Sequence, residues 1–148
     1  METTPVQLLL LREGITPPAY ATEGSAACDL CAAIDEPLLL PAHGSLSVPT
    51  GIAAAMEPGT VALICARSGL AFRRAISLVN GVGVIDADYR GEIRVGLRND
   101  GDEDYLIQPK ERIAQMMFLG YRQASFTVVS ALDETARGDG GFGSSGRL

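Results

Sequence analysis

The sequence Gly-Val-Ile-Asp-Ala-Asp-Tyr-Arg-Gly at residues 83–91 decides how the rest of the chain is interpreted. An apolar, β-branched run at residues 82–85 leads into two carboxylates, an aromatic ring and a cation. This composition predicts a strand that ends in a tight hairpin. Asp86 and Asp88 would share one face if the backbone stayed extended. Aspartate is also common in turns for purely conformational reasons, so this stretch alone does not distinguish a functional site from a polar turn.

Length and composition predict a single domain with a substantial core. The chain has 148 residues, of which 47% are hydrophobic, and a domain of this size buries roughly two thirds of its unfolded surface. No apolar run approaches the ~20 residues that cross a bilayer. The first residues lack the basic region and cleavage site of a signal peptide. We therefore expect a cytoplasmic protein without a membrane partner.

The net charge of −6 argues against a protein that binds nucleic acid by neutralising phosphates. A polyanionic ligand would need local compensation from a few arginines, backbone N–H donors and a divalent cation. The three cysteines favour small buried thiols over a zinc site. Cys28 and Cys31 form one possible ligand pair, but only Cys65 and the single His43 remain to complete it, and a structural zinc needs a full second pair.

Many short apolar segments between turn signals predict an all-β fold, either a sandwich or a barrel. The first segment is continuously apolar, which predicts a strand that is covered on both faces. The sequence Asn-Asp-Gly-Asp at residues 99–102 predicts a hairpin turn. The predicted strands are residues 6–11, 26–33, 38–40, 46–48, 52–56, 61–66, 76–78, 82–85, 93–97, 105–107, 113–119 and 126–129.

Two further segments differ from this pattern. Residues 68–75 have helical character because they lack helix breakers, and Ser68 is a candidate cap, a role that competes with any chemical one. From residue 136 the chain is rich in glycine and serine. Composition leaves two interpretations open for residues 136–148: a flexible linker, or an arm that wraps backbone N–H groups around phosphates. Residues 1–135 form the expected domain.

Five segments, in order, resemble the five motifs of the trimeric dUTPase family. They are Ala-Ala-Cys-Asp-Leu at residues 26–30, Arg-Ser-Gly-Leu-Ala at 67–71, residues 83–91, Arg-Ile-Ala-Gln at 112–115, and the glycine-rich tail around Phe142. The resemblance extends from about residue 6 to residue 146. It implies a distorted jelly-roll or β-barrel and a dUTP diphosphatase, which converts dUTP to dUMP and pyrophosphate and so clears dUTP from the nucleotide pool and supplies dUMP.

The resemblance also implies a role for each matching residue of the third motif. Asp86 matches the aspartate whose water attacks the α-phosphorus. A carboxylate is a weak base at neutral pH, so it must hold this water in line and rely on electrostatic help. Tyr89 matches the ring that packs on the deoxyribose and leaves no room for a 2′-hydroxyl. Asn80 and Gly83 match positions that read the uracil edge.

The other motifs are expected to bind the phosphates. Arg67 and Ser68, followed by Gly69, resemble the second motif, in which the arginine approaches the outer phosphates and the serine the α–β bridging oxygen. Gln115 resembles the glutamine that donates to the α-phosphate. The tail is expected to contact the nucleotide through Arg137 at the γ-phosphate, Phe142 stacked on uracil, and Gly143, Ser144 and Ser145 as donors to the phosphates.

Supporting roles are expected for four more charged residues. Asp29 matches an acid that lies near the water shell of Mg²⁺. In the family the phosphates and water bind this ion, so no direct protein ligand is expected. Arg112 is expected to be a structural cation at the subunit contact, and Asp88 and Arg90 a structural pair. The resemblance implies a homotrimer whose sites each combine motifs one, two and four of one subunit, three of a second and five of a third. The arm would then order only over bound nucleotide.

Two departures and two rival functions complete the comparison with the family. Ala66 stands where the family usually has proline, and Ala27 where it commonly has glycine, which predicts only adjusted loop packing. The nearest rival is dCTP deaminase, which shares the fold and the trimer, but its glutamate ten residues after the hairpin aspartate is Gly96 here. The deaminase hairpin has the sequence Asp-Pro-Gly, whereas this chain has Asp-Ala-Asp at the corresponding residues 86–88. The second rival is a dUTPase-like protein that has become a nucleotide-sensing regulator or a structural trimer. An intact set of Asp86, Tyr89, Arg137 and Phe142 would be surplus in a purely structural module.

Overall fold

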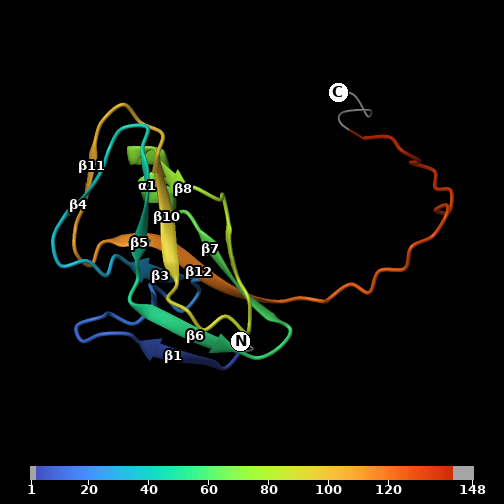
Figure 1. The fold of residues 1–148 in the computed structure, drawn as a ribbon, viewed down its shortest axis with the longest axis horizontal. Helices are drawn as coiled ribbons and strands as arrows, with labels where there is room; N and C mark the ends of the chain where they lie inside the picture. Colours follow the sequence, from blue (N-terminus) through green and yellow to red (C-terminus); the bar gives the residue numbers. More distant parts are fainter. Residues whose placement is uncertain (1–2, 142–148) are drawn as a thin grey trace.

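The computed structural model describes residues 3–141 and consists of antiparallel strands with one short helix (Figure 1). The all-β prediction is confirmed. In chain order the elements are β1 (Val6–Leu10), β2 (Ala19–Tyr20), β3 (Cys28–Cys31), β4 (Leu38–Leu40), β5 (Ser45–Pro49), β6 (Ile52–Met56), β7 (Thr60–Cys65), α1 (Ser68–Arg74), β8 (Ile76–Leu78), β9 (Gly83–Ile85), β10 (Arg94–Asn99), β11 (Tyr105–Ile107) and β12 (Arg112–Gly120).

The strands form four sheets. The largest has five strands in the order β2-β3-β12-β7-β9, and the next has three in the order β5-β10-β8. Two ribbons, β1-β6 and β11-β4, complete the body. Strands β5 and β6 follow each other directly but lie in different sheets, so the Thr50-Gly51 turn between them joins two sheets. No helix within residues 3–141 is long and apolar enough to cross a membrane.

One hydrophobic core joins the sheets. Along β3 the burial alternates, with Cys28 and Leu30 buried and Asp29 and Cys31 half-buried, as a strand with one face on the core requires. Asn99 is a polar member of this core, and its amide is satisfied by the carbonyl of Glu103 and the N–H of Gly101. The largest fully buried apolar side chains are Leu30, Leu40, Val48, Ile52, Ile76, Ile93, Val95, Leu97, Ile107, Ile113 and Met116.

The prediction that the first strand is covered on both faces is wrong for the single chain. Leu8, Leu9 and Leu10 are 39%, 61% and 41% exposed. Strand β1 pairs only with β6, in a two-stranded ribbon, and nothing else in the described chain covers its outer face. A continuous apolar run therefore marked a strand here, but not one buried within its own subunit.

Both predicted hairpins are wrong. Strand β9 pairs with β7, and the following strand β10 pairs with β5 and β8. Residues 86–93 therefore cross between sheets, and only a local turn follows β9, in which the N–H of Tyr89 donates to the carbonyl of Asp86 at 3.1 Å. Likewise β10 and β11 lie in different sheets, so residues 99–102 turn without closing a hairpin.

The predicted helix is confirmed as α1, but Ser68 is not its cap. Arg67 occupies the N-cap position without a side-chain cap bond, and Ser68 is the first helical residue. Ala75 ends the helix in the left-handed region, with a φ of 55°. The short strand β2 was not predicted, because its two residues carry too little pattern to separate from the extended connection after Pro17-Pro18.

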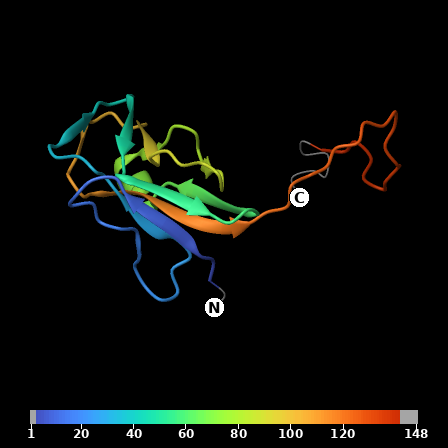
Figure 2. The same cartoon turned by 60° about the horizontal axis from the view of Figure 1, so that its bottom comes forward.

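The strand predicted over residues 126–129 is also wrong. Figures 1 and 2 both show that residues 121–141 leave the body as an extended arm. Within it Phe126 is 91% exposed and Val128 98% exposed. An isolated extended segment has no neighbour for its backbone hydrogen bonds, so the β-branched and aromatic pattern has no strand to form in a single chain. The expected division into residues 1–135 and 136–148 stays a prediction.

Candidate functional site

The middle of the five-stranded sheet brings three of the predicted motifs together. Gln115 on β12 lies directly opposite Asp29 on β3 and, on the other side, opposite Cys65 on β7. Residues that are paired in this way point to the same face of an antiparallel sheet. All three are half-buried, whereas their neighbours Leu30, Ile64 and Met116 are buried, so this face is the one turned away from the core.

Asp29 is the centre of a charged cluster on this face. Its Oδ1 accepts from Nε of Arg67 at 2.8 Å, and its Oδ2 accepts from Nη1 of Arg112 at 3.1 Å. Arg67 also donates through Nη1 to the carbonyl of Arg112 at 3.2 Å. The side chains of Asp29 and Arg67 are only 18% and 26% exposed. One carboxylate thus fixes two guanidinium groups, and Arg112 pairs within its own chain.

The remaining predicted residues of these motifs lie beside the cluster. The Nε2 of Gln115 donates to the carbonyl of Ala66 at 3.0 Å, which uses one of its two amide hydrogens and leaves the other available. Ser68 and Gly69 are exposed at the start of α1, immediately after Arg67. The structure therefore brings Arg67, Ser68, Gly69, Gln115 and Asp29 to one edge of the molecule.

The two thiols next to Asp29 have raised pKa values. Burial raises the pKa of Cys28, whose Sγ donates to the carbonyl of Met116 at 3.3 Å. Burial also raises the pKa of Cys31, and the negative charge of Asp29 adds to it, while Arg112 and Arg67 oppose the shift. Both thiols therefore stay protonated at neutral pH. The cysteines of the described chain are free, and the interpretation as small thiols fits this arrangement.

Asp86 lies elsewhere, at the end of β9, and its carboxylate is exposed. Because residues 87–88 form a turn, Asp86 and Asp88 do not share a face as an extended backbone would require. Among residues 3–141 neither carboxylate has a hydrogen-bond or ion-pair partner. The predicted pairing of Asp88 with Arg90 is wrong, since Arg90 donates instead to the carbonyls of Ala87 and Tyr89, at 2.7 and 3.0 Å.

A shallow pocket of about 90 Å³ lies between β9 and the start of β10. Asn80 and Gly83 both line it. A Cβ on Gly83 would lie 3.0 Å from the Cβ of Ile64, so glycine allows β9 to approach β7 closely. Arg94 also lines the pocket, and its Nε is held by the Oγ of Ser47 at 3.0 Å. Arg94 was not predicted as a site residue, because one arginine in an alternating strand is typical of a solvent-facing position.

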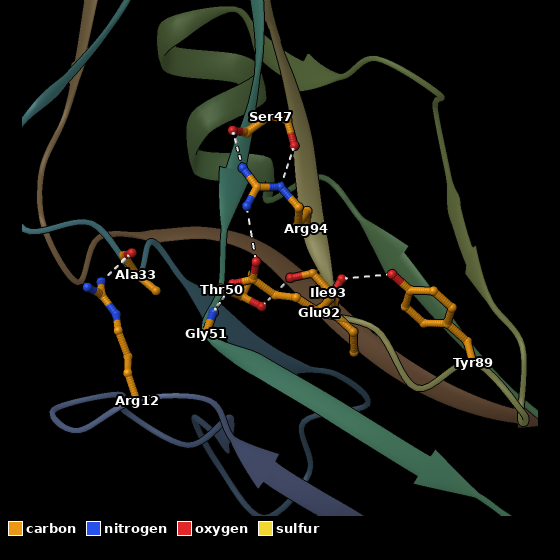
Figure 3. A network of polar contacts seen from close by, with 9 residues as sticks. All are labelled: Arg12, Ala33, Ser47, Thr50, Gly51, Tyr89, Glu92, Ile93 and Arg94. Carbon is orange, nitrogen blue, oxygen red and sulfur yellow. Dashed lines mark hydrogen bonds and ion pairs between the residues drawn. The ribbon is translucent and has the colours of Figure 1, made fainter.

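Tyr89 is 45% exposed and belongs to the same segment as Asp86. Its hydroxyl donates to the carbonyl of Glu92 at 3.1 Å (Figure 3). Arg137 lies on the extended arm, where its Nε donates to the carbonyl of Gly140 at 2.9 Å. The other predicted arm residues, Phe142, Gly143, Ser144 and Ser145, lie outside the described residues.

The register shows that the two halves of the predicted site are separated within one chain. Ile85 lies opposite Ala62 on β7, whereas Gln115 lies opposite Cys65. Asp86 is one residue further from Cys65. Steps of about 3.3 Å along β7 and about 4.8 Å between strands put the Cα atoms of Asp86 and Gln115 on the order of 15 Å apart. Asp86 therefore does not meet the Arg67–Gln115 edge of its own chain.

The described residues contain no group of three or more histidine, cysteine, aspartate or glutamate side chains that could hold a metal ion. Asp29 is the nearest acid to the arginine cluster, and both of its oxygens are already bonded to arginines. A metal at this edge would therefore depend on the oxygens of a bound ligand and on water.

A family model described as dUTPase matches residues 13–146. The chain belongs to the dUTPase family. The deoxyuridine 5′-triphosphate nucleotidohydrolase of Maricaulis maris is 47% identical over 150 residues, which cover 99% of this chain and 99% of that protein. The enzyme of the same name from Aeromonas hydrophila is 45% identical, with 98% and 99% covered.

Solved dUTPase structures share the fold. The dUTPase of Staphylococcus bacteriophage 80alpha with dUPNHPP has a TM-score of 0.88 and 25% identity, with 97% of this chain and 99% of that chain covered. A mutant dUTPase from phage phi11 of S. aureus, whose structure shows coordination of a structural Mg(II) ion, has a TM-score of 0.80 and 19% identity, with 88% and 99% covered. These likenesses confirm the predicted dUTPase fold.

The charged cluster predicts how Cys31 responds to a change at Asp29. The substitution Asp29→Asn is expected to lower the pKa of Cys31, because it removes a negative charge and keeps the positive charges of Arg67 and Arg112 in the chain. At pH 8 the thiolate fraction, and hence the rate of alkylation of Cys31 by iodoacetamide, should rise about threefold. Peptide mapping by mass spectrometry measures this rate. The matched control is Asp35→Asn, an exposed carboxylate paired with Arg12; an equal rise in the control, or no rise in Asp29→Asn, would contradict the cluster.

Proposed function

We infer that the exposed carboxylate of Asp86 and the Arg67–Gln115 edge are the two halves of a dUTP-hydrolysing site. The chain hydrolyses dUTP to dUMP and pyrophosphate, and so acts as a dUTP diphosphatase in nucleotide metabolism. The observation that supports this assignment most directly is the sheet register, which gathers Asp29, Arg67 and Gln115 on one face. A cationic edge beside the exposed Ser68 and Gly69 at the start of α1 suits a triphosphate in a protein of net charge −6.

Asp86 orients the attacking water and takes its proton. Its carboxylate is exposed and free of partners in the described chain, so it is available to a water molecule. The bond that forms is between the water oxygen and the α-phosphorus, and the bond that breaks joins the α-phosphorus to the bridging oxygen, with pyrophosphate as leaving group. Arg67, Ser68, Gly69 and Gln115 stabilise the charge that moves onto the phosphate oxygens.

The nucleoside binds at the pocket beside β9. Asn80 and the backbone of Gly83 contact the uracil edge, and Tyr89 packs on the deoxyribose and excludes a 2′-hydroxyl. Support for this placement comes from the pocket itself, which is lined by Asn80 and Gly83 and lies next to the segment of Asp86 and Tyr89. From the arm, Arg137, Phe142, Gly143, Ser144 and Ser145 close over the nucleotide.

Each site is shared between chains of a homotrimer. Within one chain the Cα atoms of Asp86 and Gln115 lie on the order of 15 Å apart, too far for the two side chains to touch each other. A neighbouring chain can supply the missing half, and the exposed apolar residues of β1 and of the arm are the surfaces that such an assembly would cover. In this arrangement Arg112 lies close to the subunit contact and the arm reaches a third chain.

Mg²⁺ is the proposed cofactor. The described residues contain no group of side chains that could bind the ion, and Asp29 is bonded to two arginines. The nucleotide phosphates and water therefore bind Mg²⁺, and Asp29 contacts it only through a bound water. When bound, the ion neutralises phosphate charge. A cytoplasmic location stays a prediction from the sequence.

The deaminase alternative is disfavoured by the pocket. Gly96, at the position of the deaminase glutamate, lines the pocket next to Val79, and the lining residues include no carboxylate. An amine cannot be replaced by water there without an acid or base. No feature of residues 3–141 favours a purely regulatory trimer over an enzyme.

The substrate assignment is tested by pyrophosphate release from dUTP, dCTP, dTTP and UTP at equal concentrations. The value of kcat/KM for dUTP should exceed that for each of the other three by about 100-fold or more. The pocket beside β9 is expected to reject the cytosine edge of dCTP and the methyl group of dTTP, and Tyr89 the 2′-hydroxyl of UTP. Release of ammonia from dCTP, or comparable rates for all four nucleotides, would overturn the assignment.

The role of Asp86 is tested by Asp86→Asn. This amide keeps the size of the side chain but cannot take a proton, so kcat should fall about 1,000-fold while the dissociation constant for the non-hydrolysable analogue dUPNHPP changes by less than about threefold. Asp88→Asn is the matched control, since it removes an equally exposed aspartate two residues away and should retain full turnover. Equal losses in the two variants would remove Asp86 as the base.

A further inference from the structure

The ring of Tyr89 lies against the backbone of Gly91. A Cβ built on Gly91 would lie 2.6 Å from Cζ and 3.0 Å from Cε2 of that ring. Non-bonded carbon atoms do not approach this closely in packed proteins. An alanine at position 91 and the observed position of the ring therefore exclude each other.

The backbone conformation at position 91 does not require glycine. Gly91 is not among the residues with a positive φ, in contrast to the nearby Gly81 with a φ of 70°. An alanine would therefore adopt the same backbone conformation without strain. The three atoms nearest to the added Cβ all belong to the Tyr89 side chain. The ring is therefore the first group that a side chain at position 91 would meet.

The hydroxyl, which is the Tyr89 atom nearest to the added Cβ, is also hydrogen-bonded. The Tyr89 hydroxyl donates to the carbonyl of Glu92, and Figure 3 shows this bond next to the carboxylate network of Glu92. The carboxylate accepts from the N–H of Gly51 at 2.9 Å through Oε1 and from Nη1 of Arg94 at 3.0 Å through Oε2. The next residue, Ile93, donates its N–H to the carbonyl of Ile52. The carbonyl that receives the hydroxyl is therefore tied to the turn between β5 and β6.

We propose that Gly91 and Glu92 are positioning residues that set the sugar specificity of this enzyme, by holding the Tyr89 ring at the place where it excludes a 2′-hydroxyl. This inference rests on the proposed contact of Tyr89 with the deoxyribose. Rejection of a substrate by steric exclusion works only when the excluding group cannot move aside. A ring whose hydroxyl end is hydrogen-bonded and also rests against a bare backbone meets that requirement; a ring on a free side chain does not.

The test is Gly91→Ala, which displaces the ring and leaves Asp86 in place. The ratio of kcat/KM for dUTP to kcat/KM for UTP should fall about 10-fold, a large part of what steric rejection of one hydroxyl achieves. The KM for dUTP should rise because sugar packing is lost, whereas kcat for dUTP should stay within about threefold of the wild-type value. Gly24→Ala is the matched control: an added Cβ there meets no atom within 4 Å, and its φ is not positive.

Tyr89→Ala separates failure of this inference from failure of the proposed function. If Tyr89→Ala lowers the dUTP to UTP ratio and Gly91→Ala does not, the positioning role is overturned and the sugar contact stands. If neither variant changes the ratio, both are overturned. Equal losses of kcat/KM for dUTP and UTP in Gly91→Ala would show a merely structural role and would also overturn the inference.

A second variant keeps the inference testable if Gly91→Ala does not fold. Tyr89→Phe removes the hydroxyl, and with it the bond to the Glu92 carbonyl and the nearest contact to Gly91, while the ring carbons stay beside Gly91. It should lower the dUTP to UTP ratio about threefold, as expected for the loss of one exposed hydrogen bond. An unchanged ratio in Tyr89→Phe would overturn the part assigned to Glu92.

Discussion

The register of β12 between β3 and β7 is the constraint on which the rest of the structure depends. It places Gln115 opposite both Asp29 and Cys65, and so sets motifs from three distant parts of the sequence on one face. Because side chains alternate along a strand, a slip of one residue would turn this face into the core and bury the charges. The buried neighbours Leu30, Ile64 and Met116 resist such a slip, since each would become exposed. Core packing and site assembly are therefore the same requirement.

The same register keeps Asp86 away from the residues it would work with. Strand β9 joins the far side of β7 in the opposite direction, so Asp86 continues past Ala62 and away from Arg67. A single chain thus holds two incomplete halves. This gives a physical reason why an enzyme of this family would be an oligomer. It also explains why apolar residues need not be buried within the subunit: Leu9 and Phe126 are exposed, although the sequence pattern predicts strands at both positions.

Prediction from the sequence succeeded where the pattern was local. Most strands and the helix were located to within one or two residues because alternation and turn residues act over short distances. It failed where the answer depends on which strand pairs with which. The hairpin expected at residues 86–91 is a crossing between sheets, and the strand expected at 126–129 has no partner in its own chain. Motif residues such as Asp86 were predicted from the family resemblance, whereas the contacts of Gly91, Glu92 and Arg94 cannot be predicted from any spacing in the sequence.

The central claim is that each site is completed by a second chain, and mixed oligomers test it most directly. Arg67→Ala and Asp86→Asn chains would be purified separately, each nearly inactive, and then allowed to exchange subunits, with exchange verified by native mass spectrometry. The account predicts that activity returns, with about one quarter of the sites combining an intact Arg67 edge and an intact Asp86 at random mixing. Mixed oligomers no more active than the two parent variants would contradict it.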